Sequence, residues 1–212
     1  MIFDFGGVVI SEPFGILTAR VGGQLAREAA MELLLGPYER DTDHVWHRVE
    51  RGEATMAEWV TYVEEEARSR GLTVDWSALQ RGVEAIVVHD VVVDRIRALR
   101  ADGYLMGLLT NNIKEGSGTW RALVPVDELF DVVVDSSVVG IRKPDPRIYA
   151  MVLEHLGGID PGRAVFLDDH PGNVEGARRA GIASVLVDDP AEAIADLDAL
   201  LTGGQGGDGA PT

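Results

Sequence analysis

The sequence predicts an α/β fold, in which a doubly wound, mostly parallel sheet carries a helical segment inserted after its first strand. From residue 90 onward, short apolar runs alternate with helical patterns, and this alternation is typical of parallel strands joined by helices. Before residue 90 the apolar residues recur at helical spacing, and no stretch is strongly strand-like. We therefore expect a sheet core from residues 1–11 and 90–202, a helical bundle at 12–89 and a flexible tail at 203–212.

The first expected strand lies within Met1–Val9 and carries an acidic residue. Its short apolar run is interrupted by Asp4 and broken directly afterwards by Gly6 and Gly7, which indicates a buried strand that ends at a carboxylate. A buried carboxylate costs free energy unless it is paired or bound to a metal, although Asp4 alone could also cap a turn. Only three residues precede Asp4, fewer than a first strand usually has, so we expect that a short N-terminal piece is missing.

The inserted segment is expected to form a small helical bundle. Gly22–Leu35 and Glu39–Arg51 carry apolar residues at helical spacing, and Trp76–Val87 favours a further helix. Thr55–Glu58 is a capping box, in which the threonine and the glutamate each bond the other's backbone, and it opens a helix that ends near Gly71.

Aromatic and histidine side chains of this segment invite a functional interpretation, but we expect structural roles for them. Four aromatic residues are expected to lie in the core of the bundle: Trp46, Trp59, Tyr62 and Trp76. His44 and His47 are three residues apart, with no third type of metal ligand nearby. We therefore expect both histidines on a solvated surface rather than in a metal site.

The alternating part of the chain supplies the remaining elements of the sheet core. Four further strands are expected, at Tyr104–Leu109, Val132–Val134, Ala164–Leu167 and Ser184–Val187. Helices are expected at Val91–Arg100, in the stretch leading to Phe130, from the Arg142–Pro146 loop to Leu156, at Asn173–Ala180 and at Ala191–Leu201. Gly103 and Gly181 follow two of these helices, as glycines often do at helix C-termini.

Polar residues end three of the expected strands, and a lysine lies in a loop that reaches the same edge of the sheet: Asp4, Thr110, Asn111, Lys143, Asp168 and Asp169. The carboxyl ends of parallel strands gather at one edge, where ligands bind. Three carboxylates there would repel one another unless a cation lay among them, and oxygen ligands favour Mg²⁺. A hydroxyl, an amide and an ammonium beside that ion would hold a phosphate. Taken singly, the paired aspartates could cap a helix, and the lysine could be an exposed loop charge.

Composition limits the class of protein. Hydrophobic residues make up 46% and charged residues 25% of the 212, as in an ordinary globular protein. The formal net charge of −16 disfavours DNA or RNA as a partner, and the absence of cysteine excludes disulfides and thiolate ligands. The sequence shows no secretion signal and no stretch of about 18 apolar residues that could span a membrane. We therefore expect a cytoplasmic protein.

The polar motifs resemble those of the haloacid dehalogenase (HAD) superfamily, whose members are mostly Mg²⁺-dependent phosphatases with a Rossmann-like core. The matching motifs are Phe3–Val8, Leu108–Asn111, Lys143 within Arg142–Tyr149, and Phe166–Asp169 with Asn173 and Gly181. The resemblance covers nearly the whole chain, including the inserted helices, which form a mobile cap in this family. Within the superfamily, the sequences of these motifs are most similar to the branch that contains the phosphatase domain of epoxide hydrolases and of certain acyl-CoA dehydrogenase fusions.

The resemblance implies a mechanism and a role for each site residue. Asp4 would attack phosphorus and form an aspartyl phosphate, and water would then hydrolyse this intermediate. The Mg²⁺ ligands would be Asp4, the Gly6 carbonyl and Asp169, with Asp168 behind them or bound through water, whereas the phosphate would be held by Thr110, Asn111 and Lys143. His170 could assist proton transfer, although we favour an exposed loop histidine. The expected partner is a small phosphorylated metabolite, and neither its identity nor the oligomeric state can be inferred.

One position departs from the family pattern. Family phosphatases usually carry a second aspartate two positions after the nucleophile as general acid and base, and this chain has Gly6 there. A positioned acid contributes about 10²–10⁴ in rate, or roughly 3–5 kcal/mol. We expect an enzyme for phosphates whose leaving group needs little protonation. The alternatives are a binding module with little turnover and a metal-free haloacid dehalogenase, against which Asp168 and Asp169 argue.

Overall fold

A five-stranded parallel sheet forms the centre of the computed structural model, which describes residues 1–12, 27–37 and 39–203. Its order is β3-β2-β1-β4-β5, and every strand pair is parallel. The strands are β1 (Ile2–Phe3), β2 (Gly107–Thr110), β3 (Val132–Asp135), β4 (Val165–Asp168) and β5 (Ala183–Leu186). The predicted α/β fold is thereby confirmed. The first strand is shorter than the apolar run suggested, because the chain turns directly after Phe5.

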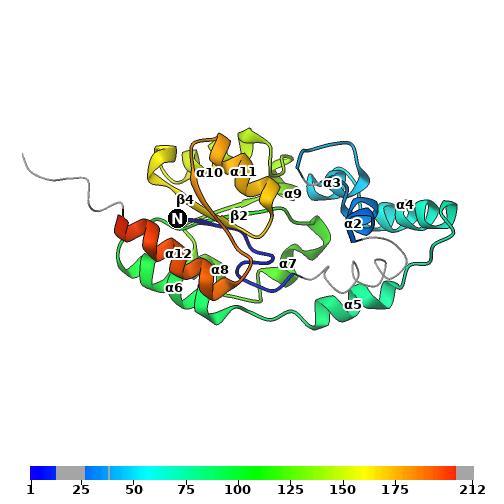
Figure 1. The fold of residues 1–212 in the computed structure, drawn as a ribbon, viewed down its shortest axis with the longest axis horizontal. Coiled ribbons are helices and arrows are strands. Elements are labelled where there is room, and N and C mark those ends of the chain that lie inside the picture. The colour runs from blue at the N-terminus through cyan, green and yellow to red at the C-terminus, as the bar shows by residue number, and fades with distance from the viewer. Residues whose placement is uncertain (13–26, 38, 204–212) are drawn as a thin grey trace, which may run out of the picture.

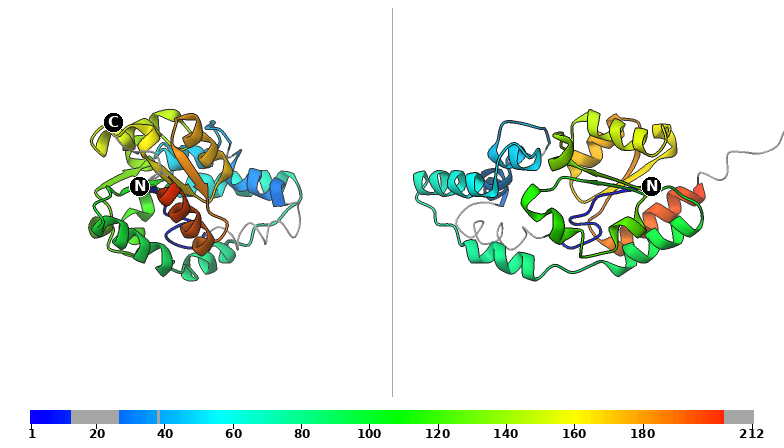
Figure 2. Two further views of the ribbon diagram at one scale, coloured as in Figure 1. Left: turned by 60° about the vertical axis from the view of Figure 1, so that its left-hand side comes forward. Right: turned by 180° about the vertical axis from the view of Figure 1, so that it is seen from behind.

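Helices cover both faces of this sheet, as the doubly wound prediction requires (Figure 1). One face is covered by α6 (Asp90–Ala101), α7 (Ser117–Trp120), α8 (Val126–Leu129) and α12 (Pro190–Gly203). The other face is covered by α10 (Pro146–His155) and α11 (Pro171–Arg179). Short elements complete the core: η1 (Lys114–Gly116), α9 (Ser136–Val139) and η2 (Pro161–Arg163). Both views in Figure 2 show α12 lying along α6.

Side-chain alternation in the central strands explains the two layers. Ile2 belongs to the hydrophobic cluster with α10 and α11, whereas Phe3 belongs to the cluster with α6 and α12. Leu108 and Leu109 divide in the same way. Successive side chains of a strand point to opposite faces, so an entirely apolar strand needs helices on both sides. The continuous apolar runs of the sequence therefore determine the layered architecture.

The inserted segment contains α2 (Arg27–Leu35), α3 (Val45–Glu50), α4 (Met56–Ser69) and α5 (Trp76–Glu84). Figure 1 shows these helices on the side toward which β1 runs from the N-terminus, beyond the carboxyl ends of the strands. They share a hydrophobic cluster of their own: Ala30, Leu33, Leu34, Leu35, Trp46, Val49, Ala54, Trp59, Val63 and Ala78. The predicted capping box at Thr55 and Glu58 is confirmed in both directions. This separate cluster supports the division into a core and a cap at 12–89, which stays a prediction.

Two of the expected aromatic core residues, Trp46 and Trp59, are buried, and Tyr62 and Trp76 pack against the same cluster. The expectation of a solvated His47 is wrong, because its side chain is completely buried. His47 Nδ1 accepts a hydrogen bond from the backbone N–H of Thr42 at 3.0 Å, and burial followed by Arg142 lowers its pKa to about 3. His47 is therefore a neutral core residue.

Two further expectations fall partly outside the described residues: the start of the helix at 22–26, and the tail from residue 204. Within the described part of the chain, no helix is both long enough and apolar enough to cross a membrane.

Candidate active site

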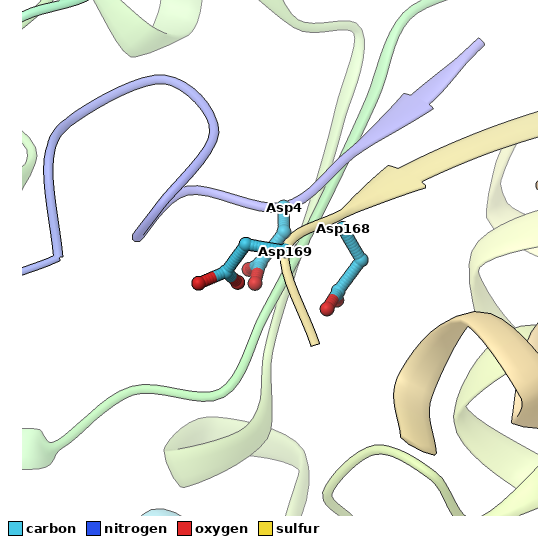
Figure 3. Close-up of side chains that lie close together, drawn as sticks. All are labelled: Asp4, Asp168 and Asp169. Atoms are coloured by element: carbon cyan, nitrogen blue, oxygen red, sulfur yellow. The ribbon is translucent and has the colours of Figure 1, made fainter. Parts of the chain in front are cut away.

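The ends of two neighbouring strands bring three carboxylates together. Asp4 directly follows β1, and Asp168 and Asp169 lie at the end of β4. Phe3 is level with Leu167 in the parallel pairing, and Asp4 N–H donates to the Leu167 carbonyl at 2.8 Å, so Asp4 is level with Asp168. One oxygen of each carboxylate lies within 4.8 Å of the others, and Figure 3 shows the three side chains turned toward one region.

Lys143 joins two of these carboxylates from the loop between α9 and α10, and its side chain is completely buried. Its Nζ lies 2.8 Å from Asp4 Oδ1 and 2.6 Å from Asp168 Oδ2, and it donates to the Leu109 carbonyl at 3.0 Å. Burial alone would lower the pKa of this ammonium, but Asp168 and Asp4 outweigh burial and raise the pKa. Lys143 is therefore a charged residue of the site, not an exposed loop charge.

The cluster carries more negative charge than this one ammonium neutralises. Burial raises the pKa of the Asp4 carboxyl to about 7, helped by Asp168 and opposed by Lys143. Burial and the charges of Asp168 and Asp4 also raise the pKa of Asp169 well above its usual value. A second cation beside these carboxylates would relieve their repulsion.

Asp168 is held by donors on several sides. The backbone N–H of His170 donates to Oδ1 at 2.8 Å, and Asn173 Nδ2 lies 3.0 and 3.1 Å from the two oxygens. Lys143 Nζ contacts Oδ2 as well. The buried Asn173, the third residue of α11, thus helps to orient the Asp168 carboxylate. With most of its lone pairs engaged, Asp168 is better placed to support the other carboxylates than to coordinate a cation directly.

The donor set fits a hard divalent cation. Asp4 and Asp169 each contribute a carboxylate oxygen to this cluster, and Asp169 is partly exposed to solvent. Carboxylate oxygens, carbonyl oxygens and water are the ligands that Mg²⁺ prefers. The expected third ligand, the carbonyl of Gly6, lies in the turn that directly follows Asp4 and Phe5.

The glycine pair after Asp4 has two different functions. Gly7 adopts a left-handed backbone with φ +73°, and a Cβ there would lie 2.2 Å from Cγ of Asp169. Only glycine therefore lets the turn approach Asp169 so closely. Gly6 has no positive φ, and within the described part of the chain a Cβ at this position would meet a single neighbour, Oε2 of Glu12 at 3.9 Å. A side chain at position 6 is therefore compatible with the backbone.

The two residues that end β2 occupy different positions. Thr110 is buried at the strand end, beside the carbonyl of Leu109 that accepts from Lys143. Both polar atoms of the Asn111 side chain bond the main chain of Lys143, since Oδ1 accepts from its N–H at 2.8 Å and Nδ2 donates to its carbonyl at 3.1 Å. Asn111 thus fixes the lysine loop, a role that spacing alone did not indicate.

The expectation that His170 is an exposed loop residue is wrong. His170 is partly buried at the N-cap of α11, where Nδ1 accepts from the backbone N–H of Gly172 at 3.2 Å. Burial lowers the pKa of its imidazole. This geometry assigns His170 to the start of the helix.

A second buried ion pair lies next to the site, and sequence reasoning did not find it. Arg142 Nε donates to Glu50 Oε2 at 2.6 Å, and both side chains are buried. This pair joins α3 to the loop that carries Lys143. Further hydrogen bonds cross between the same parts: Ser136 Oγ to the Glu50 carbonyl (2.6 Å), Lys114 Nζ to the Gly52 carbonyl (2.8 Å) and Met56 N–H to Glu115 Oε1 (3.0 Å).

The family model for haloacid dehalogenase-like hydrolases matches residues 1–181. The chain belongs to this family. The predicted resemblance is confirmed, and the site described above lies within the matched residues.

Curated relatives of this HAD-like hydrolase include proteins of several activities. Acyl-CoA dehydrogenase family member 10 of mouse is 33% identical over 95% of this chain and 19% of the relative. Bifunctional epoxide hydrolase 2 of rat is 28% identical over 82% of this chain and 34% of the relative. A protein named phosphatase MT3486 of Mycobacterium tuberculosis is 39% identical over 42% of this chain and 41% of the relative. The chain thus spans less than half the length of each.

Solved structures of the family share the fold. A HAD family enzyme of Bacteroides thetaiotaomicron, solved with magnesium and inorganic phosphate, matches with a TM-score of 0.59 at 23% identity, over 87% of this chain and 91% of that one. The L-2-haloacid dehalogenase RSc1362 matches with a TM-score of 0.61 at 19% identity, over 88% and 85%. One of these neighbours was solved with bound phosphate and the other is named a dehalogenase, so the shared fold alone does not assign a reaction to this chain.

Proposed function

We propose that this HAD-like hydrolase is a Mg²⁺-dependent phosphatase, which hydrolyses a small phosphorylated metabolite through an aspartyl phosphate on Asp4. The observation that carries the proposal is the surplus of negative charge around Asp4, where three carboxylates lie together and, among the described residues, Lys143 supplies the one ammonium in contact with them. The phosphatase relative and the magnesium–phosphate complex of a structural neighbour support it. The cytoplasmic location expected from the sequence belongs to the same proposal.

The surroundings of Asp4 direct one of its oxygens toward a substrate. The backbone N–H of Phe5 donates to Asp4 Oδ1 at 2.7 Å, and Lys143 Nζ lies 2.8 Å from the same oxygen. Two donors on Oδ1 leave Oδ2 as the attacking oxygen. When bound by Asp4, Asp169 and the Gly6 carbonyl, Mg²⁺ would supply charge neutralisation for the phosphoryl oxygens.

The remaining polar groups hold the phosphoryl group while Asp4 attacks. Thr110 at the end of β2 and the Lys143 ammonium lie at the same strand ends as Asp4, and Asn111 fixes the loop of the lysine. Positioning and charge stabilisation are most of what phosphoryl transfer requires of a protein. Attack forms the bond from Asp4 Oδ2 to phosphorus and releases the alcohol, and water then breaks this bond and releases phosphate.

A dehalogenase would use the same aspartate without a metal, and the surplus of carboxylates argues against it. The test measures phosphate release from p-nitrophenyl phosphate with Mg²⁺ and with excess chelator, beside halide release from a 2-haloacid. We expect phosphate release only with Mg²⁺, reduced at least about 10³-fold in Asp4→Asn, because the nucleophile is lost. Halide release in chelator would select the dehalogenase. Absence of both activities would select the binding module.

A further inference from the structure

Each of the three clustered carboxylates already has another role, so none of them is available to transfer a proton. Asp4 is the proposed nucleophile, and Asp168 is occupied by Lys143, Asn173 and the His170 N–H. Asp169 is a proposed cation ligand. An alkoxide leaving group nevertheless needs a proton, and the attacking water must lose one.

The chain returns over the strand end directly after Asp4. The N–H groups of Val9 and Ile10 donate to the Phe5 carbonyl at 2.9 and 3.0 Å, and Ile10 bridges to Gly6. These contacts fold residues 5–10 into a compact turn, so residues 11 and 12 come back beside the glycine pair.

The position of residue 12 is fixed by pairing with a distant segment. The Ser11 N–H donates to the Val87 carbonyl at 2.9 Å, and the Val87 N–H donates to Ser11 Oγ at 3.0 Å. The His89 N–H donates to the Val9 carbonyl at 2.9 Å. Hydrogen bonds from residues 87 and 89 therefore hold residues 9 and 11 in place, and Glu12 follows directly.

The carboxylate of Glu12 faces the turn after the nucleophile. Its Oε2 lies 3.9 Å from the point where a Cβ of residue 6 would stand, two residues beyond Asp4. Glu12 is an exposed residue. Independently, its charge contributes to raising the pKa of Asp169, which places the carboxylate near the cluster.

We propose that Glu12 is the catalytic acid and base of this enzyme, an inference that rests on the proposed phosphatase function. As Asp4 bonds to phosphorus and the bond to the leaving oxygen breaks, the Glu12 carboxyl gives its proton to that oxygen. The resulting carboxylate then takes a proton from the water that attacks the aspartyl phosphate. The bond from Asp4 to phosphorus breaks, phosphate leaves, and Glu12 is protonated again.

The first test compares leaving groups in Glu12→Gln. With an alkyl phosphate such as glycerol phosphate, which needs the acid, we expect kcat to fall about 10²-fold or more. With p-nitrophenyl phosphate, whose leaving group needs no proton, release of the first nitrophenol stays fast and later turnovers slow. A burst of nitrophenol should therefore appear in rapid mixing. Glu154→Gln, an exposed glutamate on α10, is the matched control and should keep both rates.

The second test supplies a new carboxylic acid at position 6, next to the place that the Glu12 carboxyl occupies. Gly6 has no positive φ, and among the described residues only Glu12 lies within 4 Å of its Cβ position, so the turn accepts Gly6→Asp. In the Glu12→Gln background, Gly6→Asp should recover alkyl phosphate turnover at least tenfold and abolish the burst. A merely structural role of Glu12 would give no such recovery.

Three outcomes would overturn the assignment of Glu12. They are an unchanged ratio of alkyl to aryl rates in Glu12→Gln, an equal loss of both rates without recovery by Gly6→Asp, and a wild-type enzyme that hydrolyses only aryl or acyl phosphates. The failure of the proposed function has a different signature, because the wild-type protein would then release no phosphate from any substrate.

Discussion

Arg142 and Lys143 are neighbours in the chain, and both are completely buried, yet they lie in two different ion networks. Arg142 reaches away from the sheet and pairs with Glu50 of α3 at 2.6 Å. Lys143 reaches to the strand ends and contacts Asp4 and Asp168 at 2.8 and 2.6 Å. One pair joins the inserted helices to the core, and the other organises the proposed nucleophile.

The charge balance of the two networks separates a structural pair from a reactive one. Glu50 and Asp41 lie beside the guanidinium groups of Arg142 and Arg51. Lys143 instead contacts two members of a group of three carboxylates, and burial raises the pKa of Asp4 to about 7. A balanced buried pair is complete within the protein. A surplus of buried charge is costly unless something from solution, a proton or a cation, compensates it. The imbalance of charge around Lys143 therefore distinguishes the proposed reactive site from the structural ion pair better than burial or distance does.

Lys143→Met should have the largest effect on stability and should separate the two networks. Without the ammonium, three carboxylates remain together, and we expect a loss of about 3–5 kcal/mol in the free energy of unfolding at pH 8 in chelator. Saturating Mg²⁺ should recover part of this loss, because the cation compensates the same charges. Arg142→Met is the matched control. It should lose a similar amount with no extra recovery from Mg²⁺, and an equal recovery in both variants would contradict the comparison.

Replacing both partners of the Arg142 pair tests whether it is only structural. Arg142→Met combined with Glu50→Leu removes the buried carboxylate that the single variant leaves unpaired. We expect the double variant to be more stable than Arg142→Met by about 2 kcal/mol, because an apolar replacement of a buried pair is often close to neutral. Chemical denaturation of the single and double variants measures this difference. A double variant no more stable than Arg142→Met would show that Glu50 has other essential contacts.

Gly7→Ala should be more damaging than Gly6→Ala. The left-handed backbone of Gly7 costs a non-glycine residue about 1–2 kcal/mol, and the new methyl group would also displace Asp169. We therefore expect a loss of about 2 kcal/mol together with weaker Mg²⁺ binding. Gly6→Ala should stay within about 1 kcal/mol of the wild type. Thermal unfolding with and without Mg²⁺ measures both effects, and an unchanged Mg²⁺ shift in Gly7→Ala would count against the close packing on Asp169.

The smallest effect concerns pH. The pKa of Asp4 is raised in the folded protein, so its protonated form is favoured there, and the stability it contributes at low pH is lost as the pH rises from about 4 to about 7. Burial and the charges of Asp168 and Asp4 raise the pKa of Asp169 as well, so its ionised form is also disfavoured in the folded protein. Replacing Asp169 by the neutral Asn removes this unfavourable charge, so in chelator at pH 8 Asp169→Asn should be more stable than the wild type by about 1 kcal/mol. The difference should vanish toward pH 4 and reverse in Mg²⁺. Parallel unfolding curves of both proteins at all pH values would contradict this.

The sheet and the cluster were predictable from local signals. Asp4, Thr110 and Asp168 each end an apolar strand, and parallel strands present their carboxyl ends at one edge. The Glu50–Arg142 pair was not predictable, because it joins residues 92 positions apart and depends on how the bundle docks. The burial of His47 has the same origin. The approach of Glu12 to Gly6 depends on the compact turn at 5–10, which no periodic pattern indicates.

The separate hydrophobic cluster of α2–α5 has a consequence for how this enzyme can evolve. Substitutions inside that cluster, around Trp59 for example, can reshape the inserted helices without changing Lys143 or the other residues that contact Asp4. The end of α3 lacks this freedom, since Glu50 holds Arg142 and the next residue is Lys143. Selection for new substrates should therefore accumulate changes along α2, α4 and α5, while the short stretch around Glu50 is inherited together with the loop that carries Lys143.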